Sequence, residues 1–291
     1  MEETVLIVPS ARAARPTARL AAVAIAVLAL LGGCATDPMQ SSLAPGSDGY
    51  AATIRVADAM RTSGDNASAV ALYRRANAAA PTDPVPLVKM GGALADLGAF
   101  DEAAAAFREA LKLDADNVDA LRGLGNTLLS LDQPQMAATH FEQALKLAPT
   151  DPRTYNSLGV ALDMLGNHDG AQERYLAGLA IDAENRSLKN NLGLSLALSG
   201  DYNEAIAVLR PLAFHPAATV RIRQNLALVY GLSGDLDSAA QIARIDLDDT
   251  AVRSNLAYYG VLRDLADQPR ASSLGANPVR REVLGAGRTT R

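Results

Sequence analysis

The chain has 291 residues and a formal net charge of -5, so one or two domains are expected. An acidic balance argues against a dedicated nucleic-acid binder, which usually presents a basic face. Hydrophobic residues make up 49% but aromatic residues only 4%, so Ala and Leu provide the apolar bulk and favour helices. The single cysteine, Cys34, excludes an intramolecular disulfide framework and a zinc site built from several cysteines.

The first 34 residues have the three parts of a secretory signal. Arg12, Arg15 and Arg19 precede an apolar run over residues 20–31, and small residues follow before Cys34. This order of a basic region, a short apolar stretch and a small-residue cleavage site is typical of export signals. The apolar run is shorter than the roughly 20 residues that a membrane-spanning helix needs. We therefore predict a cleaved signal over residues 1–33.

The sequence Leu31-Gly32-Gly33-Cys34 resembles the lipobox of bacterial lipoprotein signals. The resemblance implies that Cys34 becomes the N-terminus and carries diacylglycerol and acyl lipid, with no other cofactor. In these lipoproteins a residue other than Asp after the cysteine, here Ala35, implies the outer membrane, so we expect a lipid anchor on its periplasmic face. The alternative is an ordinary signal with an incidental cysteine. Residues 34–49, rich in Pro, Gly and Ser, are predicted to be a flexible tether.

A single pattern recurs every 34 residues through most of the remaining chain. In one unit it consists of Leu121, Leu124-Gly125, Ala137, Phe141 and Ala144. Apolar residues spaced by three and four predict two amphipathic helices per unit, and no segment has the alternation of a strand. The pattern resembles the tetratricopeptide repeat (TPR). Six units are predicted, beginning at Tyr50, Pro84, Val118, Pro152, Arg186 and Val220.

The TPR resemblance implies an all-α helical solenoid over residues 50–266, in which each unit buries its apolar face against its neighbours. An amphipathic stretch over residues 250–265 is predicted to be a capping helix. Residues 267–291 contain five arginines and two acids, and we expect a disordered basic tail. This tail is either a solvated end or a contact for an acidic partner or lipid head groups.

Two local features depart from the repeat. A glycine is expected to end the first helix of five units with a left-handed turn, but Asp132 takes this place in the third unit. Pro211 falls within the second helix of the fifth unit, where a proline removes a backbone hydrogen bond. We therefore expect that helix to be kinked or shortened.

Residues capable of catalysis do not form a recognisable site. His140, His168 and His215 occupy different offsets of different units, without Cys, Asp or Glu at metal-ligand spacing. The chain also contains no nucleotide-binding, nucleophile-elbow or zinc-protease motif. We predict a protein without enzymatic activity, metal, nucleic-acid partner or small-molecule substrate.

In TPR proteins the first helices line a concave groove, and this resemblance implies a partner-binding face. Asn and Gln side chains can form hydrogen bonds with both the N–H and the C=O groups of a peptide backbone, and Arg can bind a carboxylate. One alternative is that Asn at these positions of the repeat is a consensus residue that binds no ligand. A second is a carboxylate clamp like that of chaperone-tail-binding relatives, although Ser187 and Asn191 replace its basic residues. The predicted groove residues are Arg122, Asn126, Arg153, Asn156, Asn190, Asn191, Arg221, Gln224 and Asn225.

The end of the repeat region is similar to the TadD family, the TPR lipoproteins of Flp/Tad pilus assembly. The similarity lies in residues 223–228, 231–235, 242–244 and 255–259. It implies a non-enzymatic scaffold on the outer membrane that helps the pilus secretin to assemble, with other pilus-assembly proteins as partners. The alternative is an adaptor for peptidoglycan enzymes or envelope proteases.

Overall fold

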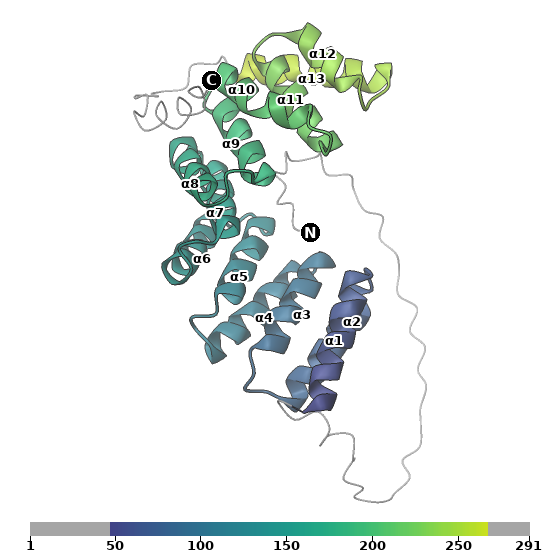
Figure 1. Cartoon of the computed structure of the whole chain (residues 1–291), viewed down its shortest axis with the longest axis vertical. Coiled ribbons are helices and arrows are strands. Elements are labelled where there is room, and N and C mark those ends of the chain that lie inside the picture. Colours follow the sequence, from purple (N-terminus) through teal and green to yellow (C-terminus); the bar gives the residue numbers. More distant parts are fainter. Residues whose placement is uncertain (1–46, 267–291) are drawn as a thin grey trace, which may run out of the picture.

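A computed structural model of the chain describes residues 47–266. The predicted signal, the lipidation site Cys34, most of the predicted tether and the predicted basic tail lie outside the described residues. Within residues 47–266 the chain forms helices and no strand, which confirms the all-α prediction (Figure 1). None of these helices is long and apolar enough to cross a membrane.

The described residues form six helical hairpins followed by one further helix. Each hairpin packs against the next, and the first helices of successive hairpins also touch. Figure 1 shows the resulting curved array, from α1 and α2 at one end to α11, α12 and α13 at the other. The helices are α1 (Asp48–Thr62), α2 (Asn66–Ala79), α3 (Val85–Asp96), α4 (Phe100–Leu113), α5 (Val118–Ser130), α6 (Pro134–Leu147), α7 (Pro152–Met164), α8 (His168–Ile181), α9 (Arg186–Leu198), α10 (Tyr202–Ala213), α11 (Val220–Leu232), α12 (Leu236–Ala243) and α13 (Asp249–Ala266).

The predicted units coincide with these hairpins. Four first helices, α5, α7, α9 and α11, begin at the predicted unit starts. In the second unit Pro84 is the N-cap residue and α3 begins at Val85. In the first unit the helix begins earlier than Tyr50, at Asp48, because the side chain of Ser47 accepts a hydrogen bond from the Tyr50 backbone N–H.

A small residue in each of four first helices allows the second helix to approach closely. A Cβ atom added to Gly125 would lie 2.4 Å from the Phe141 ring, and one added to Gly159 would lie 2.4 Å from the Tyr175 ring. Both rings are fully buried. The Leu-Gly pair of the repeat therefore marks the contact between the two helices of a hairpin.

The turns inside the hairpins have the predicted left-handed conformation. Five glycines have positive φ angles, and Asp132 is the one non-glycine residue with a positive φ, +57°, in residues 47–266. This aspartate holds the conformation that glycine adopts at lower cost, since a side chain is strained there.

Pro211 shortens its helix, as the sequence predicted. Helix α10 has 12 residues, whereas α4, α6 and α8 have 14. The chain leaves α10 after Ala213 and passes through residues 214–219 before α11 begins. The loop that replaces the two missing helical residues borders a hollow described below.

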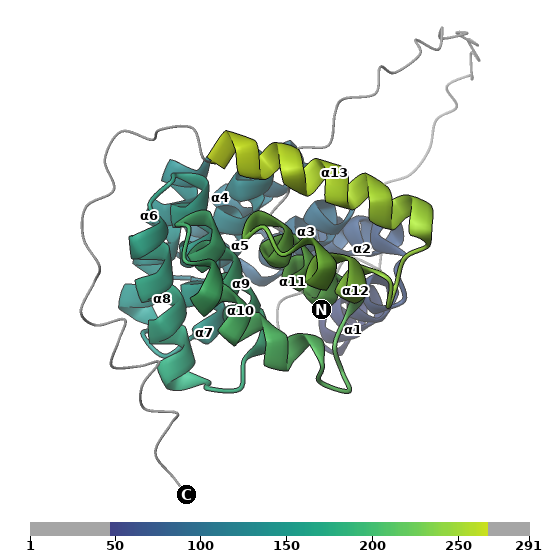
Figure 2. The same ribbon diagram turned by 90° about the horizontal axis from the view of Figure 1, so that it is seen from above.

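Helix α13 caps the end of the array and extends slightly beyond its predicted range. It packs on α11 and α12 through the buried residues Val252 and Tyr259, and Figure 2 shows it crossing the end of the stack. The Tyr259 ring lies against Gly231 of α11, where an added Cβ would be 2.5 Å from it. The short helix α12 thus leaves part of α11 for α13 to cover.

The buried apolar residues of α3 to α13 form one continuous cluster that runs from Leu87 to Tyr259. The first hairpin is different. Its buried residues belong to two smaller clusters, one around Ala57 and Tyr73 that reaches Ala93 of α3, and one around Tyr50. Met90 and Leu94 of α3 pack against both the large cluster and the cluster around Ala57 and Tyr73, so the first hairpin joins the core through α3.

Candidate binding groove

The concave side of the array contains a large hollow of about 1100 Å³. Residues of α1, α3, α5 and α7 line it, together with the beginning of α9. The structure therefore places the first helices along the groove, as the repeat resemblance implied. Four of the predicted residues line this hollow: Arg122, Asn126, Arg153 and Asn156.

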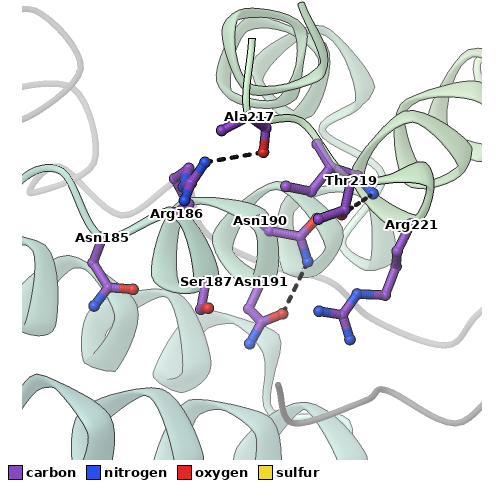
Figure 3. A pocket seen from close by; sticks show the side chains of 9 residues that line it. Asn185, Arg186, Ser187, Asn190, Asn191, Ala217, Thr219 and Arg221 are labelled. Carbon is purple, nitrogen blue, oxygen red and sulfur yellow. Dashed lines mark hydrogen bonds between the residues drawn. The ribbon is translucent and has the colours of Figure 1, made fainter. Parts of the chain in front are cut away.

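A smaller hollow of about 270 Å³ lies between α9 and α11 (Figure 3). Asn190, Asn191 and Arg221, three further predicted residues, line it. Asn185 and Ser187 line both hollows, so the two are neighbouring parts of one concave surface. We call this surface, formed by the residues that line the two hollows, the concave track. Gln224 and Asn225 were also predicted, and they line neither hollow.

Four asparagines of the concave face are linked by their own hydrogen bonds. Asn225 Nδ2 donates to Asn190 Oδ1 at 2.9 Å, Asn190 Nδ2 donates to Asn191 Oδ1 at 3.2 Å, and Asn191 Nδ2 donates to Asn156 Oδ1 at 2.8 Å. We call this series the amide ladder. It connects α11 to α9 and α9 to α7.

The amide ladder gives the predicted asparagines a structural role. Asn156, Asn190 and Asn191 are each at least nine-tenths buried, and a buried amide without a partner would be costly. These amides thus stabilise the stacking of three repeats as well as facing the concave track. The relevant sequence signal is the separation of 35 residues between hydrogen-bonded asparagines, one more than the repeat.

The predicted arginines are also held by neighbours. Arg122 forms ion pairs with Asp119 at 2.6 Å and Asp151 at 2.8 Å, and Arg153 Nε lies 3.1 Å from Asp151. Burial raises the pKa of Asp151, but hydrogen bonds from Thr154 and Arg153 and the charge of Arg122 outweigh it, so the pKa lies below the usual value. Arg122 is mostly buried, whereas the Arg153 side chain is 66% exposed and remains accessible to a partner.

The N-terminal part of the large hollow contains features that the sequence prediction missed. Lys89 pairs with Asp58 at 2.9 Å and Arg61 pairs with Asp96 at 2.7 Å, in each case between α1 and α3. Between these pairs and α7 the lining includes apolar and small residues. They are Val85, Val88, Gly92, Phe107 and Gly123.

A buried polar cluster lies between α7, α8 and α9, away from the residues that line the two hollows. Asp163 Oδ1 accepts a hydrogen bond from Ser195 Oγ at 2.7 Å and lies 2.8 Å from His168 Nδ1, and Asp163 Oδ2 accepts one from the Tyr175 hydroxyl at 2.9 Å. Burial and the nearby Asp163 charge raise the pKa of Tyr175 well above its usual value. This cluster joins three helices.

The other histidines have separate local contacts. His140 Nδ1 is 3.2 Å from Gln143, and His215 Nδ1 accepts a hydrogen bond from the Ala217 backbone. Within residues 47–266 no three His, Cys, Asp or Glu side chains are grouped so that they could hold a metal ion. The concave track is accordingly the candidate site of this chain.

Comparison with known proteins supports the assignment of the fold. Two tetratricopeptide-repeat models match residues 88–152 and 140–173. Comparison with curated protein sequences gives no match.

Several solved structures are similar in fold. The TPR protein TTC0263 of Thermus thermophilus is 25% identical, with a TM-score of 0.52, covering 61% of this chain and 99% of that one. The protein pilF of Pseudomonas aeruginosa is 17% identical, with a TM-score of 0.60, and the match covers 76% of this chain and 100% of that one. YrrB, described as a TPR protein with an unusual peptide-binding site, is 20% identical, with a TM-score of 0.50. The match covers 62% of this chain and 96% of that one. The described part of this chain is thus a tetratricopeptide-repeat array.

Proposed function

We propose that this protein is a non-enzymatic scaffold that binds an extended segment of a partner protein along its concave track. The observation that carries the proposal is the concave track itself, which has a large hollow bordered by polar and apolar side chains of four first helices. Concave surfaces of this kind are how helical repeat proteins usually bind their partners.

We further propose that the protein is an outer-membrane lipoprotein that assists assembly of the Flp/Tad pilus secretin. This proposal is supported by the lipobox-like sequence ending at Cys34 and by the TadD-like residues in the last part of the array. Two or three acyl chains would hold the protein on the membrane, since each buried CH₂ contributes about 0.8 kcal/mol. A partner on the same membrane would meet the concave track at high effective concentration, so modest affinity would suffice.

The experiment that tests the concave track compares two triple variants. The track variant is Val85→Glu, Arg153→Glu and Ser187→Glu, which changes exposed lining residues of α3, α7 and α9 outside the amide ladder. The control variant is Ala105→Glu, Thr139→Glu and Arg174→Glu, which changes exposed residues of the second helices α4, α6 and α8. Each triple replaces one arginine and two neutral residues by glutamate, so both have the same effect on net charge.

Each full-length variant is expressed in the pilus-forming host and recovered from detergent-solubilised membranes, and the secretin that copurifies is quantified. We expect the track variant to lose secretin and pili while the control variant keeps both. Recovery of secretin by a normally folded track variant would refute binding through the concave track. Recovery of peptidoglycan hydrolases or proteases in place of secretin would refute the pilus role and leave the binding role standing.

The anchor is tested separately by labelling cells with a radioactive fatty acid. We expect label on the wild-type chain in the outer-membrane fraction, and neither label nor membrane association for Cys34→Ser. A matched Ser42→Ala variant should behave like the wild type. Membrane association of the Cys34→Ser variant would contradict the lipid anchor.

A further inference from the structure

The ring of Phe107 reaches the concave side of the array. This residue belongs to the second helix α4, whereas the other described residues that line the large hollow belong to first helices or directly precede them. Phe141 and Tyr175 occupy the same repeat position in α6 and α8, but they are fully buried and line neither hollow. The large hollow therefore contacts an aromatic ring that the following two units keep covered.

Gly123 of α5 accounts for this difference. A Cβ atom added to Gly123 would lie 2.4 Å from both Cε1 and Cζ of Phe107. The same position of the next two units is taken by Ser157 and Asn191, which are buried and carry side chains. Because Gly123 has none, the space beside the edge of the Phe107 ring stays open to the large hollow.

Helix α3 contributes a second glycine and an apolar side chain. Gly92 lines the hollow, and a Cβ atom added to it would lie 2.8 Å from Nη1 of Arg61, whose Nε is bonded to Asp96 at 2.7 Å. The half-buried Val88 lies one turn earlier on α3 and packs against the main apolar cluster. We call the four lining residues Val88, Gly92, Phe107 and Gly123 the apolar subsite.

The charged residues that line the large hollow already have partners within the chain. Each of them takes part in an ion pair, as in Lys89–Asp58 at 2.9 Å and Arg61–Asp96 at 2.7 Å. A charged ligand group would lose its water and would have to compete with these pairs. An apolar side chain would displace water from Phe107 and Val88 without breaking any of them. The hollow next to the apolar subsite therefore favours an uncharged occupant.

We propose that the apolar subsite binds one large apolar side chain of the partner segment, from the class of Phe, Leu, Ile and Met. The proposal rests on the proposed function, since it names the side chain that one part of the concave track selects. The occupant lies over the gap at Gly123 and contacts the edge of the Phe107 ring, a contact that an aromatic occupant makes edge-to-face.

Asn126 provides a place for the backbone of the same segment. It lies one turn after Gly123 on α5 and also lines the large hollow. Its buried Oδ1 atom has no hydrogen-bond partner within residues 47–266. A buried acceptor without a partner is costly, and a backbone N–H of the bound segment satisfies it. The subsite thus combines an apolar contact for a side chain with a hydrogen bond for the backbone beside it.

The test uses variants that the repeat itself tolerates. Val88→Asn introduces the residue that Asn156 and Asn190 supply at the same position of later units. Gly123→Ser introduces the residue found at Ser157 and fills the space beside the Phe107 ring. The control is Leu113→Asn, which removes an exposed apolar side chain of α4 that lines neither hollow. Thermal unfolding followed by circular dichroism verifies that each variant is folded, and Val88→Asn decides the question if Gly123→Ser is not.

Each full-length, detergent-solubilised chain serves as bait for a library of random peptides displayed between fixed flanks. We expect peptides selected by the wild type to show a large apolar residue enriched about tenfold at one position, the effect of burying one such side chain. Val88→Asn and Gly123→Ser should lose this enrichment, and Leu113→Asn should keep it. Enrichment that survives in folded Val88→Asn would overturn the proposal.

A direct binding measurement follows from the absence of tryptophan in this chain. A selected peptide is made with Trp in place of its enriched apolar residue, so that the peptide alone supplies the Trp emission. We expect the emission to shift to shorter wavelength on binding to the wild type, and the Kd to rise about tenfold for Val88→Asn and to stay unchanged for Leu113→Asn. Binding without a shift would place the side chain in water and contradict the apolar subsite.

The selection also separates this inference from the proposed function. If the wild type selects peptides that lack an apolar preference, the apolar subsite is wrong and peptide binding by the concave track stands. If it selects no peptide, both fail.

Discussion

Arg223 and Asp246 join helix α11 to the turn that precedes α13. The Arg223 Nε and Nη2 atoms donate to the two carboxylate oxygens at 2.7 and 2.5 Å, and Nη1 donates to the Ala218 carbonyl at 3.1 Å. The hydrogen bond from Arg223 lowers the pKa of Asp246 below its usual value. One side chain therefore ties the loop before α11 and the turn before α13 to the same helix.

Replacing this arginine should loosen the cap of the array. In Arg223→Gln the largely buried carboxylate of Asp246 loses its paired donors, so α13 should open more often. We expect faster hydrogen exchange in residues 249–266 and unchanged exchange in α5. The control is Arg253→Gln, which removes an exposed arginine of α13 itself. Equal protection of α13 in the wild type and Arg223→Gln would show that this contact does not hold the cap.

The amide ladder makes Asn191 a structural residue. Asn191→Ala leaves Asn156 Oδ1 without its donor and Asn190 Nδ2 without its acceptor, and both residues are mostly buried. We expect the free energy of unfolding in urea to fall by about 1–3 kcal/mol. Ser187→Ala, an exposed change on the same helix, should have little effect. An unchanged unfolding midpoint in Asn191→Ala would indicate that the amides exchange their partners for water at no cost.

Substitution by glycine can remove the conformational strain of the left-handed turn at Asp132. Asp132→Gly should raise the free energy of unfolding by about 1 kcal/mol, because glycine adopts a positive φ without the side-chain strain. The converse change, Gly166→Ala at the same position of the next unit, should lower it by a similar amount. Urea unfolding measures both. A loss of stability in Asp132→Gly would mean that the aspartate side chain contributes more than its conformation costs.

The buried Tyr175 hydroxyl predicts a loss of stability in alkaline solution. Its pKa in the folded state is raised above the unfolded value near 10, first by burial and then by Asp163. This contribution is complete below about pH 10 and is lost as the pH rises toward the folded pKa, because the unfolded tyrosine ionises first. Tyr175→Phe should therefore reduce the slope of the urea midpoint between about pH 9 and 11. Identical slopes in the two proteins would contradict this assignment.

The repeat pattern predicted the fold closely because each of its positions has one packing role. The Leu124-Gly125 pair marks the site where Phe141 packs, and Pro211 marks an early helix end, so these features follow from local chemistry. The start of α1 depends on Ser47, a cap within the segment that its composition assigned to the tether. A single capping side chain is a weak signal beside a run of Pro, Gly and Ser.

The candidate site was predicted only in part. The first helices do line the groove, and seven of the nine predicted residues line one of the two hollows. The partners of those residues could not be predicted, because the Asn191–Asn156 bond depends on the rotation between neighbouring repeats. The smaller hollow and the hydrogen bond from Arg186 to the Ala217 carbonyl depend on the path of residues 214–219, which the repeat pattern does not specify.

The terminal position of the first hairpin bears on how the molecule responds to mechanical load. A force applied to the chain before Ser47 reaches α1 and α2 first, and this hairpin packs mainly against a single neighbour, through α2 and α3. Under tension the first hairpin would peel away while the remaining five units stayed assembled, because each repeat relies mainly on its nearest neighbours. Its loss would remove Asp58, Arg61 and Thr62 from the wall of the large hollow and leave the smaller hollow between α9 and α11 intact.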